Sequence, residues 1–178
     1  MNFRIKKSEI IFSGKVFDLK VDQIVYDSGN EGIRDDAMHP GGAVVVPVKN
    51  DGKIVMVKQF RYPFQKFLLE LPAGKLEKNE NSKHCAVREL EEETGYKSND
   101  VKKLGSIYTT PGFCSEELQI FQARNLIAGD HNREEGEFGM EVFEFTLEEI
   151  KEKIRKGEIV DSKTICGIYM LMNNTGGN

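Results

Sequence analysis

Residues 74–96 read GKLEKNENSKHCAVRELEEETGY, and this stretch decides how the rest of the chain is interpreted. Its second half, residues 82–94, predicts a helix. Asn81 or Ser82 provides the side chain that an N-cap requires, and Gly95 is the residue type that most often ends a helix. We therefore expect one regular helix that a short loop precedes and a glycine ends.

The predicted helix carries several carboxylates on one face. An α-helix turns about 100° per residue, so Glu89, Glu92 and Glu93 share a sector of about 100°, and Glu91 points away from it. Arg88, one turn before Glu92, can brace that carboxylate. Oxygen ligands without His or Cys suit a hard divalent cation such as Mg2+ or Mn2+. The alternative is a solvated acidic face, which is what most runs of glutamate form.

The whole stretch resembles the Nudix box, GX5EX7REUXEEXGU, in which U is a bulky aliphatic residue. Every fixed position matches, and the only departure is Tyr96 at the last aliphatic place. The resemblance implies an α/β protein with the Nudix fold, a mixed β-sheet sandwiched between α-helices. It also implies that Glu89, Glu92 and Glu93 bind divalent metal, in a hydrolase of nucleoside diphosphates linked to another group. The residues that it implies as support for this site are Gly74, Glu80, Arg88 and Gly95.

Further segments resemble the ADP-ribose pyrophosphatase branch of the Nudix hydrolases. They are His39–Gly41, Gln59–Tyr62, Leu69–Gly74, Tyr108–Phe113 and Gly157–Thr164. Pro111 lies 15 residues beyond the last box position, a distance typical of that branch. The resemblance also implies that the carbonyl of Ala73, just before the box glycine, helps to hold a metal ion.

The substrate contacts are predicted partly from periodicity and partly from the resemblance. Gln59 and Arg61 share one face of a predicted strand, and a guanidinium suits a diphosphate or a ribose. The resemblance implies substrate contacts for Arg61 and Arg34, and we add Gln59 and Pro111 to the predicted substrate-binding set. A surface ion pair is the alternative for Arg61. Glu70 is interpreted as a structural partner of Arg61, with a substrate contact as the alternative.

The segment 131–138, HNREEGEF, is acidic and contains a glycine. Its plain interpretation is a solvated loop. The resemblance implies instead that a glutamate of this loop closes over the substrate and acts as the base for the attacking water. Glu137 is the first candidate and Glu135 the second. With Glu92 they form the predicted set of catalytic carboxylates.

Outward from the box the chain predicts alternating strands and helices. The Asn50–Gly52 turn predicts a hairpin between strands 43–48 and 54–61. A capping box at Thr146 and an N-cap at Asp161 predict two further helices. The other strands are expected at 15–26, 103–108, 117–123 and 141–145.

The organisation is predicted as an N-terminal β-strand region, residues 1–40, that forms a small antiparallel meander, followed by a Nudix hydrolase domain, residues 41–178. The N-terminal region is too small to bury a core of its own, which suits strands that pack against a second copy. The resemblance likewise implies a homodimer. We therefore assign dimerisation and part of the substrate contacts to residues 1–40.

The composition and the net charge argue against several other kinds of function. The chain has 178 residues, 25 of them basic and 29 acidic, for a net charge of −4. This charge argues against a nucleic-acid partner, and we see no apolar stretch long enough to cross a membrane. The three cysteines form no CxxC pair, so neither a disulfide framework nor a zinc site is expected. We predict a protein of the reducing cytoplasm.

The sequence thus predicts a cytoplasmic, homodimeric, Mg2+-dependent enzyme, with Mn2+ as a possible substitute, that splits ADP-ribose into AMP and ribose 5-phosphate. The box orients metal and diphosphate without selecting the sugar, so GDP-mannose and UDP-glucose are alternative substrates. A non-catalytic, nucleotide-sensing Nudix domain is the alternative from another class. The complete set of box carboxylates disfavours it.

Overall fold

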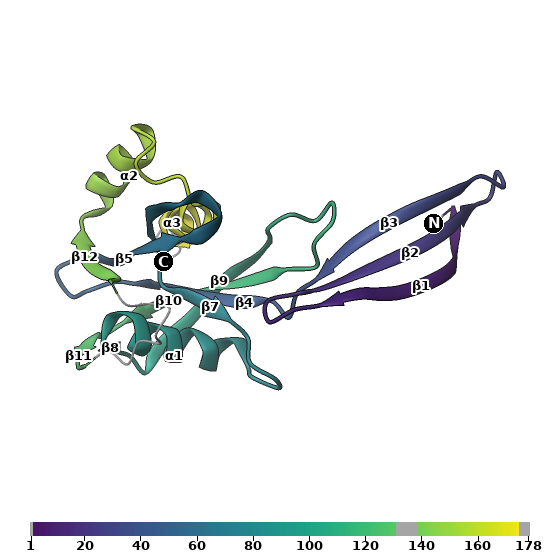
Figure 1. Cartoon of the computed structure of the whole chain (residues 1–178). Coiled ribbons are helices and arrows are strands. Elements are labelled where there is room, and N and C mark those ends of the chain that lie inside the picture. The colour runs from purple at the N-terminus through teal and green to yellow at the C-terminus, as the bar shows by residue number, and fades with distance from the viewer. Residues whose placement is uncertain (1, 131–138, 175–178) are drawn as a thin grey trace. The chain divides into compact units, whose positions relative to one another are not determined.

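The computed structural model describes residues 2–130 and 139–174, which divide into two compact units (Figure 1). Unit 1 comprises residues 1–41 and 108–117. Unit 2 comprises residues 42–107 and 118–178. Among the described residues, no helix is long and apolar enough to span a membrane.

Unit 1 is built on an antiparallel sheet of three strands in the order β1-β2-β3. The strands are β1 (Phe3–Ser13), β2 (Asp18–Tyr26) and β3 (Glu31–Met38). The expected antiparallel meander is confirmed, but the sequence predicted strand structure only for 15–26. Most side chains of β1 are exposed, so β1 lacks the apolar alternation that marks a core strand. Backbone bonds join Ala37 of β3 to Phe113 and Ser115 of the second segment.

The described residues of unit 2 form three sheets. The largest has the order β7-β4-β10-β9, and β10 pairs in parallel with β4 while β7 pairs antiparallel with it. Its strands are β4 (Gly42–Pro47), β7 (Ala73–Lys75), β9 (Asp100–Tyr108) and β10 (Glu117–Arg124). The second sheet, in the order β12-β5-β6, consists of β5 (Ile54–Arg61), β6 (Lys66–Glu70) and β12 (Glu141–Phe145). The small sheet pairs β8 (Tyr96–Lys97) with β11 (Ile127–Ala128), and a 3-10 turn, η1 (Tyr62–Phe64), follows β5.

The predicted hairpin between 43–48 and 54–61 is wrong. A tight turn does form, because the N–H of Gly52 donates to the carbonyl of Lys49 at 2.9 Å. However, β4 and β5 lie in different sheets and share only the isolated bridge between Val48 and Ile54. The reason is that β4 is a central strand whose edges are taken by β7 and β10, and all its residues are buried.

The core forms on both faces of β4. Val44 and Val46 join a cluster with α3 (Ser162–Asn174), whereas Ala43 and Val45 join a cluster with α1 (Ser82–Thr94). Successive strand residues point to opposite faces, so α1 and α3 cover opposite sides of this sheet (Figure 1). The α3 side also receives Ile54 and Met56 of β5 and Ile150 of α2 (Leu147–Arg155). The predicted mixed sheet between helices is confirmed.

The helix ends are also as predicted. The Asn81 side chain accepts a hydrogen bond from the N–H of Lys83 at 2.9 Å, and Gly95 ends α1 with a φ of 76°. Thr146 and Glu149 form the capping box of α2. Asp161 accepts a hydrogen bond from the N–H of Thr164 at 3.0 Å at the start of α3. These ends depend on local contacts, which sequence patterns describe well.

Candidate active site

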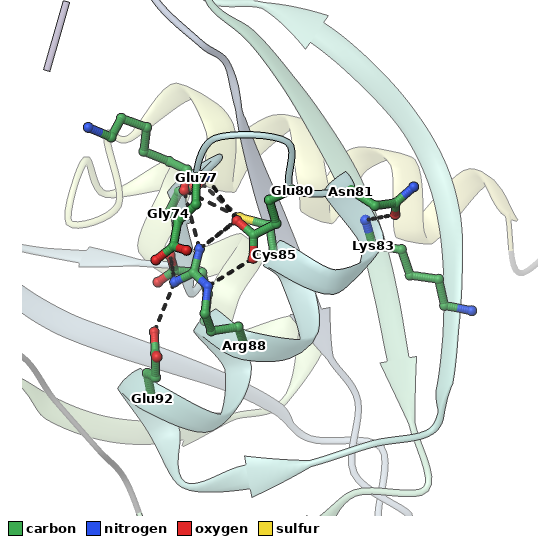
Figure 2. Close-up of polar contacts among 10 residues, drawn as sticks. Gly74, Glu77, Glu80, Asn81, Lys83, Cys85, Arg88 and Glu92 are labelled. Carbon is green, nitrogen blue, oxygen red and sulfur yellow. Dashed lines mark hydrogen bonds and ion pairs between the residues drawn. The ribbon is translucent and has the colours of Figure 1, made fainter.

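Arg88 lies at the centre of the carboxylate cluster on α1 (Figure 2). Its Nη1 donates to Oε1 of Glu89 at 2.7 Å and to Oε2 of Glu92 at 2.9 Å. Its Nε and Nη2 each donate to one oxygen of Glu80 at 2.9 Å. The guanidinium therefore contacts three carboxylates, and the predicted brace between Arg88 and Glu92 is confirmed.

Glu80 belongs to the loop before α1 and anchors Arg88. Its Oε2 also accepts a hydrogen bond from the N–H of Glu77 at 3.0 Å. The hydrogen bonds from Arg88 hold the pKa of Glu80 below its usual value, and the same bonds raise the pKa of Arg88. Both groups are therefore charged at neutral pH. This pair keeps the cation beside the helix carboxylates.

Gly74 gives the carboxylate of Glu89 its space. A Cβ atom at this position would lie 1.7 Å from Oε1 and 2.0 Å from Cδ of Glu89. Gly74 is held close because β7 pairs with β4, in which Ala43 is its partner. The box therefore requires a glycine here, since any side chain would push the buried Glu89 carboxylate away.

The remaining helix carboxylates divide as the helical period predicts. Glu93 is buried, and its Oε2 accepts a hydrogen bond from the N–H of Ala73 at 3.2 Å. Two residues predicted as metal ligands are thus neighbours. Glu91 points to the other side, where it pairs with Lys97 at 2.5 Å.

The carboxylates fit a hard divalent cation by their chemistry. In the described ranges, 2–130 and 139–174, no three His, Cys, Asp or Glu side chains are gathered as a ready metal site. Instead, two of the predicted ligands, Glu89 and Glu92, share one nitrogen of Arg88. These carboxylates offer only oxygen atoms and already surround the positive charge of Arg88, and such ligands suit a hard cation such as Mg2+ or Mn2+.

Arg61 and Glu70 form a two-point ion pair between β5 and β6. Nε of Arg61 donates to Oε1 of Glu70 at 2.9 Å, and Nη2 donates to Oε2 at 2.6 Å. Burial by itself raises the pKa of Glu70, but the bonds from Arg61 and the charge of Lys163 outweigh it and lower that pKa. The interpretation of Glu70 as the structural partner of Arg61 is confirmed.

Lys163 was not among the residues predicted from the sequence. This buried lysine contacts Oε2 of Glu70 and donates to Oδ2 of Asp161 at 2.9 Å. A lysine in the first turn of an otherwise apolar helix was the available signal, since buried lysines almost always have a charged partner. Asp161 was predicted only as a helix cap.

Comparison with known families decides the identity of this fold and site. A family model described as "NUDIX domain" matches residues 38–165, which include every element that carries the α1 cluster. The chain belongs to the NUDIX family. The prediction made from residues 74–96 is therefore confirmed.

Individual Nudix relatives cover nearly the whole chain. An "ADP-ribose pyrophosphatase" of Bacillus subtilis (strain 168) is 44% identical over 165 residues, which are 92% of this chain and 89% of that protein. A "Methanol dehydrogenase activator" of Bacillus methanolicus is 41% identical over 167 residues, 93% of this chain and 90% of that protein. A solved structure of an "ADP compounds hydrolase" is similar with a TM-score of 0.85 over 97% of this chain and 94% of the other. At 15% identity that likeness shows the fold alone.

The other predicted Nudix site residues lie in different parts of the chain. Gln59 is on β5 with Arg61, in unit 2. Arg34 is on β3 of unit 1, where its Nη2 contacts the Tyr26 hydroxyl at 2.5 Å. Pro111 is exposed in the second segment of unit 1. The predicted bases, Glu135 and Glu137, lie outside the described residues.

The one departure from the Nudix box has a structural role. The hydroxyl of Tyr96 donates to Oε1 of Glu144 at 2.8 Å, and Lys49 donates to the other oxygen at 2.6 Å. Tyr96 therefore links β8 to β12 while its ring packs against the α1 side of the core. A tyrosine satisfies the packing requirement of an aliphatic position and adds a polar link.

Proposed function

We propose that this protein hydrolyses ADP-ribose to AMP and ribose 5-phosphate, with Mg2+ as its metal and Mn2+ as a substitute. The observation that carries the proposal is the intact carboxylate cluster around Arg88 on α1. Nudix hydrolases generally require a divalent metal ion. The name of the Bacillus subtilis relative supports the choice of substrate.

In this proposal Glu89, Glu92 and Glu93 hold the metal, together with the carbonyl of Ala73. A bound divalent ion neutralises the diphosphate and activates water for attack. Gly74 keeps the Glu89 carboxylate in place, and the hydrogen bond from the N–H of Ala73 holds Glu93. The chain thereby orients its ligands before the metal binds, which lowers the cost of reaching the reactive arrangement.

The substrate contacts stay as predicted from the sequence. Arg61 presents a guanidinium to the diphosphate or terminal ribose, with Gln59 beside it on the same strand face. Arg34 and Pro111 stay proposed substrate contacts. Glu137 is proposed as the base for the attacking water, with Glu135 as the second candidate.

We further propose a cytoplasmic homodimer in which residues 1–40 pack against the partner and residues 41–178 form the hydrolase domain. The support is unit 1, whose strands and β1–β2 turn carry exposed apolar side chains: Ile5, Ile10, Ile11, Phe12, Val16 and Ile33. Such a surface is unusual for a chain that stays monomeric. Light scattering coupled to size exclusion tests it: a monomer at micromolar concentration would contradict the proposal.

The substrate test is a panel of nucleotide sugars. Purified protein with Mg2+ is mixed with ADP-ribose, GDP-mannose or UDP-glucose, and the products are separated by chromatography. We expect the highest kcat/KM for ADP-ribose and loss of turnover in EDTA. Preference for another sugar would replace the substrate, and turnover of none would contradict the enzymatic function and favour a nucleotide-sensing domain.

A second candidate function is activation of a dehydrogenase. The Bacillus methanolicus relative named as such an activator is 41% identical over 93% of this chain. The test adds the protein to a purified methanol dehydrogenase and measures the rate of methanol oxidation. A rise in rate with wild type supports this candidate. If Glu93→Gln protein gives the same rise, the activation does not depend on hydrolysis.

A further inference from the structure

Four charged side chains form a network where β5, β6 and α3 meet. Oε2 of Glu70 accepts hydrogen bonds from both Nη2 of Arg61 and Nζ of Lys163, and Lys163 also donates to Asp161. The Glu70 side chain is 1% exposed and that of Lys163 is 11% exposed, whereas Arg61 retains 36%. The network is therefore buried at one end and accessible at Arg61.

The buried end of the network is fixed to the backbone. Oδ2 of Asp161 accepts hydrogen bonds from the N–H and the hydroxyl of Thr164, at 3.0 and 2.6 Å. The hydroxyl oxygen of Thr164 in turn accepts a bond from the N–H of Leu71 at 2.8 Å. Leu71 directly follows Glu70, so hydrogen bonds connect the start of α3 both to the Glu70 side chain and to the backbone next to it. Lys163 has little freedom to move.

Lys163 also determines how Glu70 can hold Arg61. A carboxylate this deep in the protein stays ionised only when enough positive charge surrounds it. Arg61 supplies part of that charge, but its side chain is about one-third exposed and its charge is partly screened by solvent. The ammonium of Lys163, buried beside the same oxygen, supplies the rest. The two parallel hydrogen bonds that Arg61 donates to Glu70 then fix the plane of the guanidinium.

One edge of the Arg61 guanidinium stays available. Nε and Nη2 are used by Glu70, and Nη1 has no hydrogen-bond partner among residues 2–130 and 139–174. The charge of Glu93, a proposed metal ligand, helps to raise the pKa of Arg61, after the larger effect of the bonds to Glu70. Ala73, whose N–H donates to Glu93, follows Glu70 by only three residues, so the network lies next to the segment that holds this α1 carboxylate.

We propose that Lys163, held by Asp161, is a positioning residue that acts through Glu70 to orient Arg61 toward the substrate diphosphate. This inference rests on the proposed function for its substrate. It assigns to the start of α3 a role in substrate affinity rather than only in stability. The positioning residue and the metal ligands lie on different helices, so their effects can be separated.

The test is a double-mutant cycle on ADP-ribose hydrolysis with Lys163→Met, Arg61→Lys and the combined variant. We expect Lys163→Met to raise KM about tenfold, the effect of loosening one charge-assisted hydrogen bond, with kcat changed less than about twofold. In the Arg61→Lys background the same substitution should change KM less than about twofold. An equal rise in both backgrounds, or a fall in kcat alone, would overturn the proposal.

The matched control is Lys151→Met, which removes an exposed lysine paired with Glu148 on α2 at 2.7 Å. Its KM should equal that of the wild type. If Lys163→Met does not fold, Glu70→Gln/Lys163→Met removes both buried charges at once and restores neutrality. That variant should also raise KM about tenfold, since a neutral amide holds Arg61 less firmly. A wild-type KM would overturn the proposal.

A second readout does not depend on activity. The Nε–Hε signal of Arg61 in a 15N spectrum, identified by its loss in Arg61→Lys, reports how firmly Glu70 holds the guanidinium. We expect its exchange with water to be about tenfold faster in Lys163→Met than in the wild type. Unchanged exchange would contradict the proposal. If the wild type releases no AMP, the proposed function fails, and this signal alone decides the role of Lys163.

Discussion

The helices α1 and α2 place their charges in opposite ways. In α2 the first turn holds Glu148 and Glu149, and the last turn holds Lys153 and Arg155. In α1 the first turn has no acid and the last turn no base, while Glu91, Glu92 and Glu93 stand near the C-terminal end. Because the helix dipole favours acids at the N-terminus and bases at the C-terminus, α2 follows the rule and α1 violates it.

This contrast indicates that the charges of α1 serve function and those of α2 serve stability. Acids near the negative end of a helix, spaced to repel each other, destabilise α1, and Arg88 offsets only part of that repulsion. A local conflict of this kind is expected at functional sites. Substitutions of the α1 carboxylates on the face of Arg88 should therefore change activity, and substitutions in α2 should change stability.

The largest effect is expected for Glu93→Gln. This change keeps the shape of a buried side chain but removes the charge that a metal ion needs. We expect kcat for ADP-ribose to fall about 10³-fold, as when one preorganised electrostatic group is removed from an active site. Denaturant unfolding should give a stability within about 1 kcal/mol of the wild type, because the repulsion from neighbouring carboxylates and the attraction to Arg61 are lost together.

Glu91→Gln is the matched control for this prediction. Glu91 is on the same turn but pairs with Lys97 on the other side of α1. Its kcat should stay within about twofold of the wild type. Equal losses in the two variants would show that the whole acidic turn, rather than the face toward Arg88, matters for activity.

A smaller loss of activity is expected for Gly74→Ala. The added Cβ would lie 1.7 Å from Oε1 of Glu89 and must displace that carboxylate. We expect metal affinity, measured as the Mg2+ concentration for half-maximal rate, to weaken about 10- to 100-fold.

Gly52→Ala is the control for Gly74→Ala, because it should lower stability without changing metal binding. Gly52 has a φ of 83° and nothing within 4 Å of an added Cβ. Alanine there should cost about 1 kcal/mol of stability through backbone strain and leave the Mg2+ dependence unchanged. If Gly74→Ala behaves like Gly52→Ala, the space beside Glu89 has no role in metal binding.

Removal of the α2 cap should affect stability alone. The Thr146 hydroxyl accepts a hydrogen bond from the N–H of Glu149 at 3.3 Å, as part of the capping box. Thr146→Ala should lower the free energy of unfolding by about 1 kcal/mol, measured by urea titration. The kcat/KM for ADP-ribose should not change. A loss of activity at unchanged stability would contradict the contrast between the two helices.

The smallest effect concerns pH. Bonds from the backbone and hydroxyl of Thr146 hold the pKa of Glu149 below its ordinary value of 4.5. A lowered pKa in the folded state stabilises the protein above pH 4.5, and this stabilisation is lost as the pH falls through the folded value. The stability difference between wild type and Glu149→Gln should therefore shrink from pH 7 to pH 3. A constant difference would show that the charge of Glu149 does not contribute.

Local rules explain what the sequence predicted well. The ends of α1, the carboxylate face and the brace by Arg88 all depend on residues within a few positions of each other. The same holds for the capping box of α2. The spacing of the box residues indicated the family, and the family implied a mixed sheet between helices.

The failures concern contacts between distant residues. The turn at Asn50–Gly52 predicted a hairpin, but sheet membership was decided by β7 and β10, which take both edges of β4. The partnership of Glu70 with Lys163 joins residues 93 positions apart, and no local pattern encodes it. The strand β1 was not predicted for a different reason: its side chains are mostly exposed and show no apolar alternation.

The most direct test of the contrast between α1 and α2 is the binding of Mn2+ itself. Free Mn2+ is measured by electron paramagnetic resonance while the ion is titrated into wild type, Glu93→Gln and Glu149→Gln. We predict that the α1 variant binds at least about tenfold more weakly, whereas the α2 variant matches the wild type. Equal binding by all three proteins would contradict the assignment of the α1 carboxylates to a metal ion.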